Sequence, residues 1–192
     1  MEMLLTVGVG VGLASVAGLR AFVPLFSAAL FGALGLFALP DPYGAAAEWP
    51  VVGGLGALAV AELALDKVRA LERSFNYAMV PVRGASGAVL LAAAIGEGFG
   101  ADAAPWLAAG AVVAGGTSVL KVMLRPPARV VSAGVSAVFL SVLEDLAGVA
   151  GSLAGLFIPY LPVLLVAFLL YFFYRVKRRR GRKYGGLRIL GD

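Results

Sequence analysis

The sequence contains no cysteine and no histidine. Without cysteine there is no disulfide, thiolate nucleophile or thiolate metal ligand. Without histidine, most zinc and copper sites and the usual general base of hydrolases are excluded. Any proton transfer must therefore use Asp, Glu, Lys, Arg or Tyr. We expect no metal, no cofactor and no enzymatic activity.

Charged residues are also scarce. They make up 14% of the 192 residues, whereas hydrophobic residues make up 61% and the mean hydropathy is +0.95. A soluble domain usually carries about a quarter charged residues, so this chain has too little polar surface to cover a globule in water. The composition predicts an integral membrane protein that has the lipid bilayer as its main partner.

Long apolar segments divide the chain into six predicted transmembrane helices, so the expected fold is all-α and polytopic. A helix of about 20 residues crosses a bilayer. The segments are residues 4–37, 51–68, 84–98, 105–124, 130–150 and 153–174. The first would form a straight helix about 51 Å long, against a hydrocarbon core of about 30 Å. We therefore expect this helix to break near Gly18 and Pro24, beside the charged Arg20.

The charges of the connections alternate along the chain. All Lys and Arg residues except Arg20 follow or flank the second, fourth and sixth apolar segments, whereas the other connections hold only the acids Asp41, Glu48, Glu97 and Asp102. Basic connections face the cytoplasm. The pattern predicts a multi-pass membrane protein with both termini in the cytoplasm. The basic tail, residues 175–192, is expected to lie on anionic lipid rather than to bind nucleic acid.

The two halves of the chain show the same order of features: small residues, a basic residue, a proline and a later helix with two acids. These are Arg20, Pro24, Glu62 and Asp66 in residues 1–100, and Lys121, Pro126, Glu144 and Asp145 in residues 101–174. Because each half has three predicted spans, the halves must run in opposite directions. Inverted repeats of this kind are common in secondary transporters, with the substrate site near the midplane.

Charges inside predicted spans are the strongest candidates for functional residues, because each is costly in lipid and usually finds a partner. Helix lengths predict two pairings. Arg20 should meet Glu144 or Asp145 in the outer half of the membrane, and Lys121 or Arg125 should meet Glu62 or Asp66 in the inner half. Two such clusters could form an alternating gate, with Gly18, Pro24 and Pro126 as helix breaks. The alternative is that both clusters are static and only hold the helices together.

Residues 83–87 offer a further candidate. Arg83, Gly84 and Ser86 stand at the predicted start of the third span, where free amides of a helix N-terminus could bind an anion. The alternative is an ordinary helix start whose arginine extends toward the membrane surface.

Four stretches resemble one known family: AGLRAFVPLF at 17–26, AELALDKV at 61–68, VPVRGASGAVLLAAA at 80–94 and SVLEDLAG at 141–148. Together they are similar to the bacterial integral-membrane family called domain of unknown function 4126, over residues 4–174. The most specific element maps onto Gly18, Leu19, Arg20, Ala21, Phe22 and Pro24. A departure is that Val68 is followed by Arg69, where such proteins tend to continue with proline. The resemblance implies a protein of the bacterial plasma (inner) membrane and names no activity.

The leading hypothesis is a small secondary transporter or flippase whose substrate is a small solute or lipid, and the buried bases favour an anionic one. Arg20 and Lys121 would bind that anion or neutralise the acids, while the four acids would bind protons or cations or act as gates. The alternatives are a membrane enzyme that acts on a lipid through Glu62 or Asp66, a channel, and a scaffold. A chain this small could need a second copy of itself to enclose a substrate site, so a homodimer is one expected arrangement.

Overall fold

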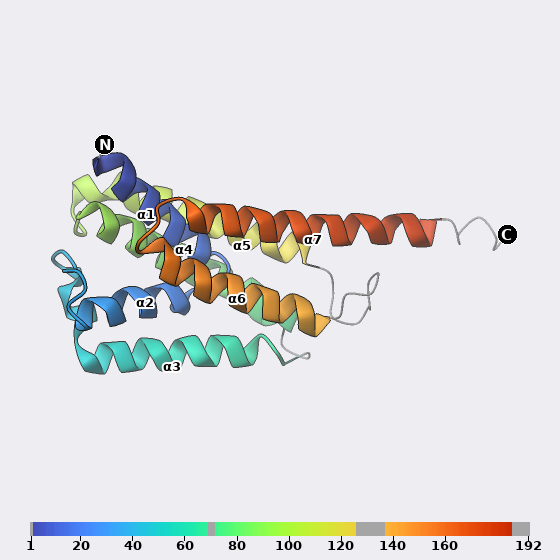
Figure 1. Cartoon of the computed structure of the whole chain (residues 1–192), viewed down its shortest axis with the longest axis horizontal. Helices are drawn as coiled ribbons and strands as arrows, with labels where there is room; N and C mark the ends of the chain where they lie inside the picture. The colour runs from blue at the N-terminus through green and yellow to red at the C-terminus, as the bar shows by residue number, and fades with distance from the viewer. Residues whose placement is uncertain (1, 69–71, 126–136, 186–192) are drawn as a thin grey trace.

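The computed structural model describes residues 2–68, 72–125 and 137–185, and this part of the chain is all-α, as predicted. Seven α-helices lie along one long axis (Figure 1). They are α1 (Glu2–Ala17), α2 (Phe22–Ala33), α3 (Trp49–Leu65), α4 (Glu72–Ile95), α5 (Ala104–Leu124), α6 (Ala137–Gly155) and α7 (Leu161–Gly185), with short 3-10 helices at Tyr43–Ala47 and Ala101–Ala103.

The first apolar segment breaks where the sequence predicted, between Ala17 and Phe22, but it then turns back. The carbonyl oxygen of Leu4, in α1, accepts a hydrogen bond of 2.7 Å from the Tyr160 hydroxyl. The ring of Phe31, in α2, lies 5.7 Å from the ring of Phe157. The far ends of α1 and α2 therefore meet the same α6–α7 connection, and the two helices form a hairpin. The sequence left open whether residues 4–17 span or re-enter, and in the structure the segment turns back on itself instead of continuing as one broken helix.

The helices α3 to α7 run the length of the bundle in alternating directions (Figure 1). Among the described residues, two helical stretches, Ser74–Ile95 and Ala101–Leu124, are long and apolar enough to cross a membrane. The predicted third span, 84–98, was too short, because α4 begins at Glu72 and continues through Pro81. Proline is tolerated inside membrane helices where neighbouring groups satisfy the freed carbonyl.

The two ends of the bundle differ in charge. One end, which we call the acidic end, holds the α2–α3, α4–α5 and α6–α7 connections and the acids Asp41, Glu48, Glu97 and Asp102 (Figure 1). The opposite end, which we call the basic end, holds the last residues of α3 and α5, the first described residues of α4 and α6, and the bases Lys67 and Arg125. The α1 helix begins at the acidic end and α7 ends at the basic end (Figure 1). Because the α1–α2 hairpin adds a reversal, the start of α1 and the end of α7 lie at opposite ends of the bundle, which does not support the expectation that both termini share one side of a membrane. Pro126 lies outside the described residues.

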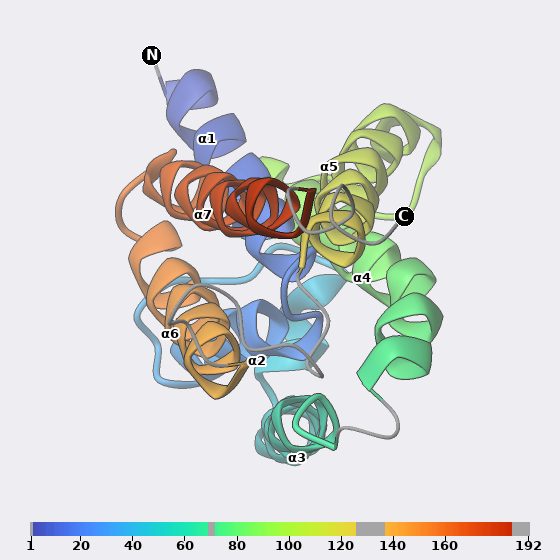
Figure 2. The same ribbon diagram turned by 90° about the vertical axis from the view of Figure 1, so that its right-hand side faces the viewer.

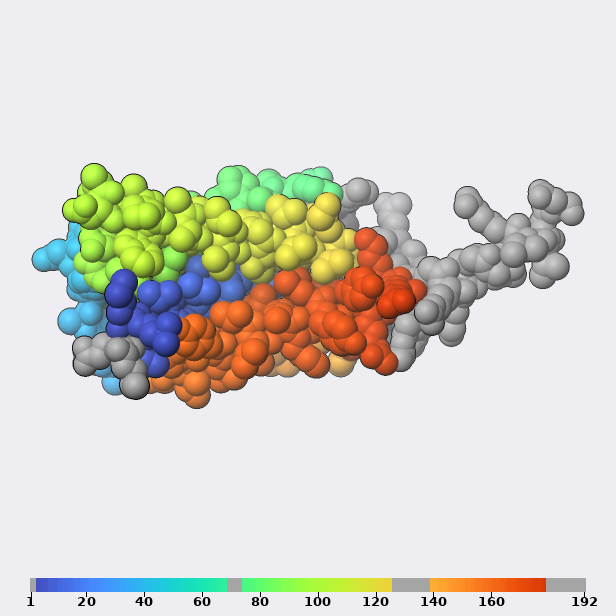
Figure 3. All heavy atoms as spheres, turned by 90° about the horizontal axis from the view of Figure 1, so that it is seen from above, coloured from blue at the N-terminus to red at the C-terminus, as the bar shows by residue number. Residues whose placement is uncertain are grey.

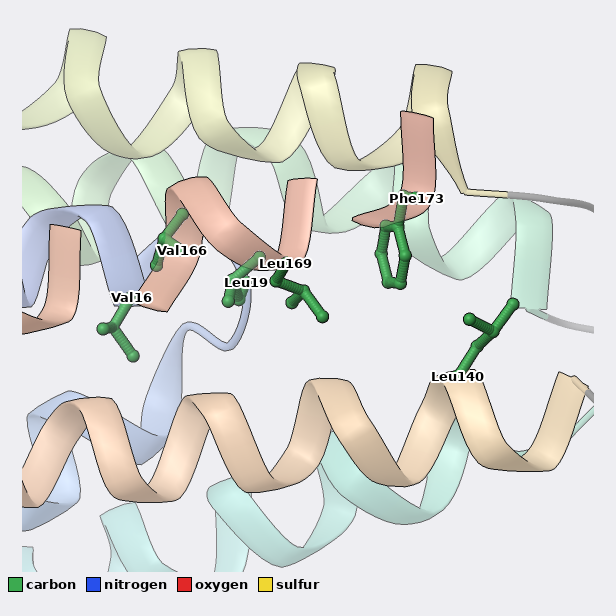
Figure 4. Packing of buried hydrophobic residues seen from close by; sticks show 6 residues of the cluster. All are labelled: Val16, Leu19, Leu140, Val166, Leu169 and Phe173. Atoms are coloured by element: carbon green, nitrogen blue, oxygen red, sulfur yellow. The ribbon is translucent and has the colours of Figure 1, made fainter. Parts of the chain in front are cut away.

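The α1 helix is central to the packing, although it begins the chain. Figure 3 shows it lying between α7 and the α4–α5 pair on one face of the molecule. Side chains of α1, the α1–α2 turn, α6 and α7 form an apolar cluster (Figure 4), which consists of Val16, Leu19, Leu140, Val166, Leu169 and Phe173. This cluster fixes the end of α1, and so it positions the turn that follows.

The α4 and α5 helices approach each other closely, and glycine makes this possible. A Cβ atom added to Gly110 would lie only 2.3 Å from the carbonyl oxygen of Gly87, and one on Gly87 would lie 2.3 Å from the Cβ of Ala114. Small residues let helix backbones pack this closely in lipid. Helix α1 packs against this closely packed α4–α5 pair.

Candidate functional site: a buried charge cluster at a helix turn

The turn between α1 and α2 leaves backbone groups without helical partners, and charged side chains satisfy them. The amides of Ala21 and Phe22 donate to the two oxygens of Glu62, at 3.0 and 3.1 Å. The ammonium of Lys121 donates to the carbonyl of Leu19 at 2.9 Å. An anion thus stands at the N-terminus of α2 and a cation at the C-terminus of α1, the arrangement that both helix dipoles favour.

Arg20, inside this turn, binds carboxylates from two other helices. Its Nη2 atom lies 2.8 Å from Asp66 of α3 and 3.5 Å from Glu144 of α6, and it also donates to Asp145. Its Nε and Nη1 atoms are buried and have no hydrogen-bond partner among the described residues. Arg20 therefore joins α3 to α6 and keeps two donor nitrogens unused.

Two bases at the end of α5 complete the centre of the cluster. Lys121 forms an ion pair with Glu144. Arg125 lies 3.1 Å from Asp66 and 3.1 Å from Glu144. Each acid is therefore shared by more than one base, and removal of a single charge would leave others to be compensated.

The α4 helix contributes a second layer. Arg83 donates to Glu62, with Nη2 at 3.3 Å, to Asn76 at 3.1 Å and to Ser118 at 3.3 Å. Asn76 in turn donates to Asp66 at 2.7 Å. Both carboxylates of α3 thus have a partner on α4.

Burial of these charges is nearly complete. The side chains of Arg20, Glu62, Asp66, Arg83, Lys121 and Glu144 are inaccessible to solvent. Exposure rises only towards the basic end, where the side chain of Arg125 is 10% exposed, Asp145 is 17% exposed and Lys67 is 53% exposed. Lys67 and Asp145 form an ion pair of 2.9 Å. Solvent can therefore approach the cluster from the basic end, past this pair.

On the other side of the turn, towards the acidic end, the neighbours are apolar. Leu13, Ala17, Leu90 and Ala114 form a buried cluster. Three buried bases face three buried acids across the turn, so the innermost part is electrically balanced. Such balance is required because each unpaired ion costs several kcal/mol in a medium of low dielectric.

The structure brings together all seven of the predicted charged site residues, though in a different arrangement. Arg20 meets Glu144 and Asp145, and Arg125 meets Asp66, as predicted. Lys121 pairs with Glu144, whereas the prediction paired it with Glu62 or Asp66.

The predicted separation into two clusters at two depths is wrong, since the charges form one cluster. The chain reaches Arg20 from the acidic end, because α1 runs in the opposite direction to the one expected. Glu144 forms ion pairs with Arg20, Lys121 and Arg125, so the charges from both halves of the chain lie at one level.

The anion site predicted at Arg83, Gly84 and Ser86 requires a helix start that the structure does not have. Arg83 lies in the middle of α4, and the Ser86 hydroxyl donates to the carbonyl of Val82 within the same helix. Arg83 instead serves as the partner of Glu62. The predicted helix break at Gly18 agrees with the observed turn, while Pro24 lies just inside α2.

Sequence reasoning missed Asn76, Ser118 and Lys67 as members of the cluster. Asn76 and Arg83 are seven residues apart, which places them on one face of a helix. That signal becomes visible only when α4 is extended back through Pro81. Ser118 precedes Lys121 by three residues on α5, so the same spacing rule would have found it.

The carboxylates of the cluster face bases, and no group of acidic side chains in the described ranges could hold a metal ion. No curated protein and no solved structure matches the chain. A family model does match, over residues 7–179, and it spans the α1–α2 turn and every charged residue of the cluster. The chain therefore belongs to the family described as Domain of unknown function (DUF4126).

Proposed function

We propose that the protein is a small membrane transporter or flippase in which the charge cluster at the α1–α2 turn is the moving part. The observation that carries the proposal is the turn itself: a broken apolar segment whose free backbone groups bind Glu62 and Lys121. Broken helices with backbone ends beside charged groups are a recurring feature of secondary transporters.

In the proposed topology, α3 to α7 cross the membrane and the α1–α2 hairpin re-enters from the acidic side. The basic end then faces the cytoplasm by the positive-inside rule. If residues 1–100 and 101–174 were an inverted repeat, the acids of one half would lie as far above the membrane midplane as those of the other half lie below it. Because Glu62, Asp66, Glu144 and Asp145 instead meet at one turn, we assign them to one shared site.

Within this site the exposed pair Lys67–Asp145 is proposed to act as the gate at the basic end. It is the most accessible ion pair of the cluster, and Asp145 also binds the buried Arg20. When this pair opens, Asp145 would be free to move away from Arg20. The guanidinium of Arg20, with its unused Nε and Nη1 atoms, would then bind an anionic group.

The alternative of a lipid-modifying enzyme draws no support from this geometry. The two oxygens of Glu62 accept from backbone amides, and one of them also accepts from Arg83; Asp66 binds Arg20, Asn76 and Arg125. A general acid or base needs an oxygen that can reach substrate. Neither carboxylate offers one in this arrangement.

Proteoliposomes test the proposal with two defined probes, a pH step read as a transient current and the exchange of head-labelled phospholipid between leaflets. We expect the protein to raise at least one signal above that of protein-free liposomes. Because Lys67→Gln weakens the gate, it should raise the rate of that signal by about tenfold. The matched control is Lys177→Gln, since Lys177 is an exposed lysine that binds only the carbonyl of Met123 among its described contacts. Signals equal to those of empty liposomes with both probes would overturn the proposal.

A further inference from the structure

A pocket separate from the charge cluster opens within the hairpin at the acidic end. Its volume is about 420 Å³, and its walls come from α1, α2, the α2–α3 connection and α4. Leu13 and Leu90, which belong to the buried apolar cluster, line it and separate it from the charged turn. Small-molecule sites usually have volumes of roughly 300–1,000 Å³, so the pocket is large enough for a ligand.

The chemistry of the wall indicates what the pocket would hold. Its lining residues are apolar except for Thr6; they include Val9 and Leu13 from α1, Ala28 from α2, and Leu90 and Ala93 from α4. A wall of this kind offers van der Waals contact and almost no hydrogen bonding, so it suits a hydrocarbon chain.

The connections beside the pocket are acidic. Pro40 and Gly96 line the pocket, and the next residue in each connection is an acid, Asp41 or Glu97. The two connections pack together, because the Tyr43 hydroxyl donates to the carbonyl of Gly98 at 3.4 Å and the Tyr43 ring lies 5.2 Å from that of Phe99. Burial raises the pKa of the Tyr43 phenol, which therefore stays a neutral donor.

No basic residue occurs in the connections at this end, as residues 34–48, 96–103 and 156–160 contain no Lys or Arg. A negatively charged headgroup would be repelled by the acidic connections, whereas an amine would be attracted. We infer that the pocket binds the hydrocarbon chain of an amphiphile whose amine-bearing headgroup rests against Asp41 and Glu97. This site goes beyond the proposed transport function and does not depend on it.

A photoreactive pair of amphiphiles tests the inference. Both carry the same sixteen-carbon chain with a diazirine, one with an amine headgroup and one with a carboxylate, and both are added to the purified protein in phosphatidylcholine nanodiscs. We expect the amine probe to label residues of the pocket wall, and the carboxylate probe to label them about fivefold less. Labelling is located by mass spectrometry of the cleaved protein.

Two sets of variants separate the chain site from the acidic connections. Ala93→Phe fills the pocket and should lower labelling by about tenfold. The matched control, Ala109→Phe, places the same ring on the exposed face of α5 and should leave labelling unchanged. Asp41→Asn combined with Glu97→Gln should remove the preference for the amine without filling the pocket.

Two results would overturn the inference. Labelling spread equally over the exposed helix faces and insensitive to Ala93→Phe would show that the pocket binds no chain. Pocket labelling that is equal for the amine and carboxylate probes would contradict the assigned headgroup. If Ala93→Phe does not fold, the Asp41→Asn and Glu97→Gln double variant still tests the inference, because it leaves the pocket unfilled. Because no transport is measured, failure here is distinct from failure of the transporter proposal.

Discussion

At the scale of single residues, burial decides what each charge contributes. Lys121 and Lys67 are both lysines that pair with an acid of α6, yet one side chain is inaccessible and the other is half exposed. Exposed ion pairs contribute roughly 0–1 kcal/mol to stability, because water solvates both ions when the pair opens. A buried ion that loses its partner has no such alternative.

We therefore expect Lys121→Gln to lower the free energy of unfolding by about 3–5 kcal/mol, because Glu144 loses one of its bases and the Leu19 carbonyl loses its donor. The same change at Lys67 should cost less than about 1 kcal/mol. Thermal melting of both variants in detergent measures the difference. Equal effects would contradict the burial of the cluster.

The seven charged candidates could be predicted from the sequence because a charge within an apolar segment stands out, and lipid makes it expensive. Their partners could be predicted only in part. Arg20 with Asp145 was found, while Lys121 with Glu144 was not, because pairing depends on depth and depth depends on the direction of each helix.

At the scale of helices, apolar length and glycine position explain most of the packing. The predicted helices at 51–68 and 105–124 agree closely with α3 and α5. The α1–α2 hairpin could not be predicted, because a break near Gly18 fits both a kinked crossing and a reversal. What distinguishes them is the set of partners for the turn, Glu62 and Lys121, which lie far away in sequence.

Two glycines of α5 provide a test at this scale. A Cβ atom at Gly110 would meet the backbone of α4, whereas one at Gly115 has nothing within 4 Å. We expect Gly110→Ala to destabilise the protein by about 1–3 kcal/mol through the forced separation of α4 and α5. Gly115→Ala should be neutral or slightly stabilising, since alanine favours the helix. A similar loss of stability in both variants would contradict the close α4–α5 contact.

At the scale of the whole molecule, seven helices surround one polar centre. Viewed from the basic end, α3 lies at the periphery beside α2 (Figure 2), and polar contacts through Glu62 and Asp66 join it to the α1–α2 turn, α4 and the end of α5. In the proposed transporter, exchange of these ion pairs at the α1–α2 turn would let α3 move relative to the closely packed α4–α5 pair.

The central claim is that the first apolar segment re-enters and places its turn on the charge cluster, and cysteine cross-linking tests it most directly. The natural sequence has no cysteine, so introduced thiols are the only ones present. The hairpin predicts that Leu4→Cys with Tyr160→Cys and Phe31→Cys with Phe157→Cys both cross-link with a short bifunctional maleimide. The control pair, Leu4→Cys with Val68→Cys, should not react. Cross-linking of only one test pair, or of the control pair, would mean that the segment crosses the membrane and would contradict the account.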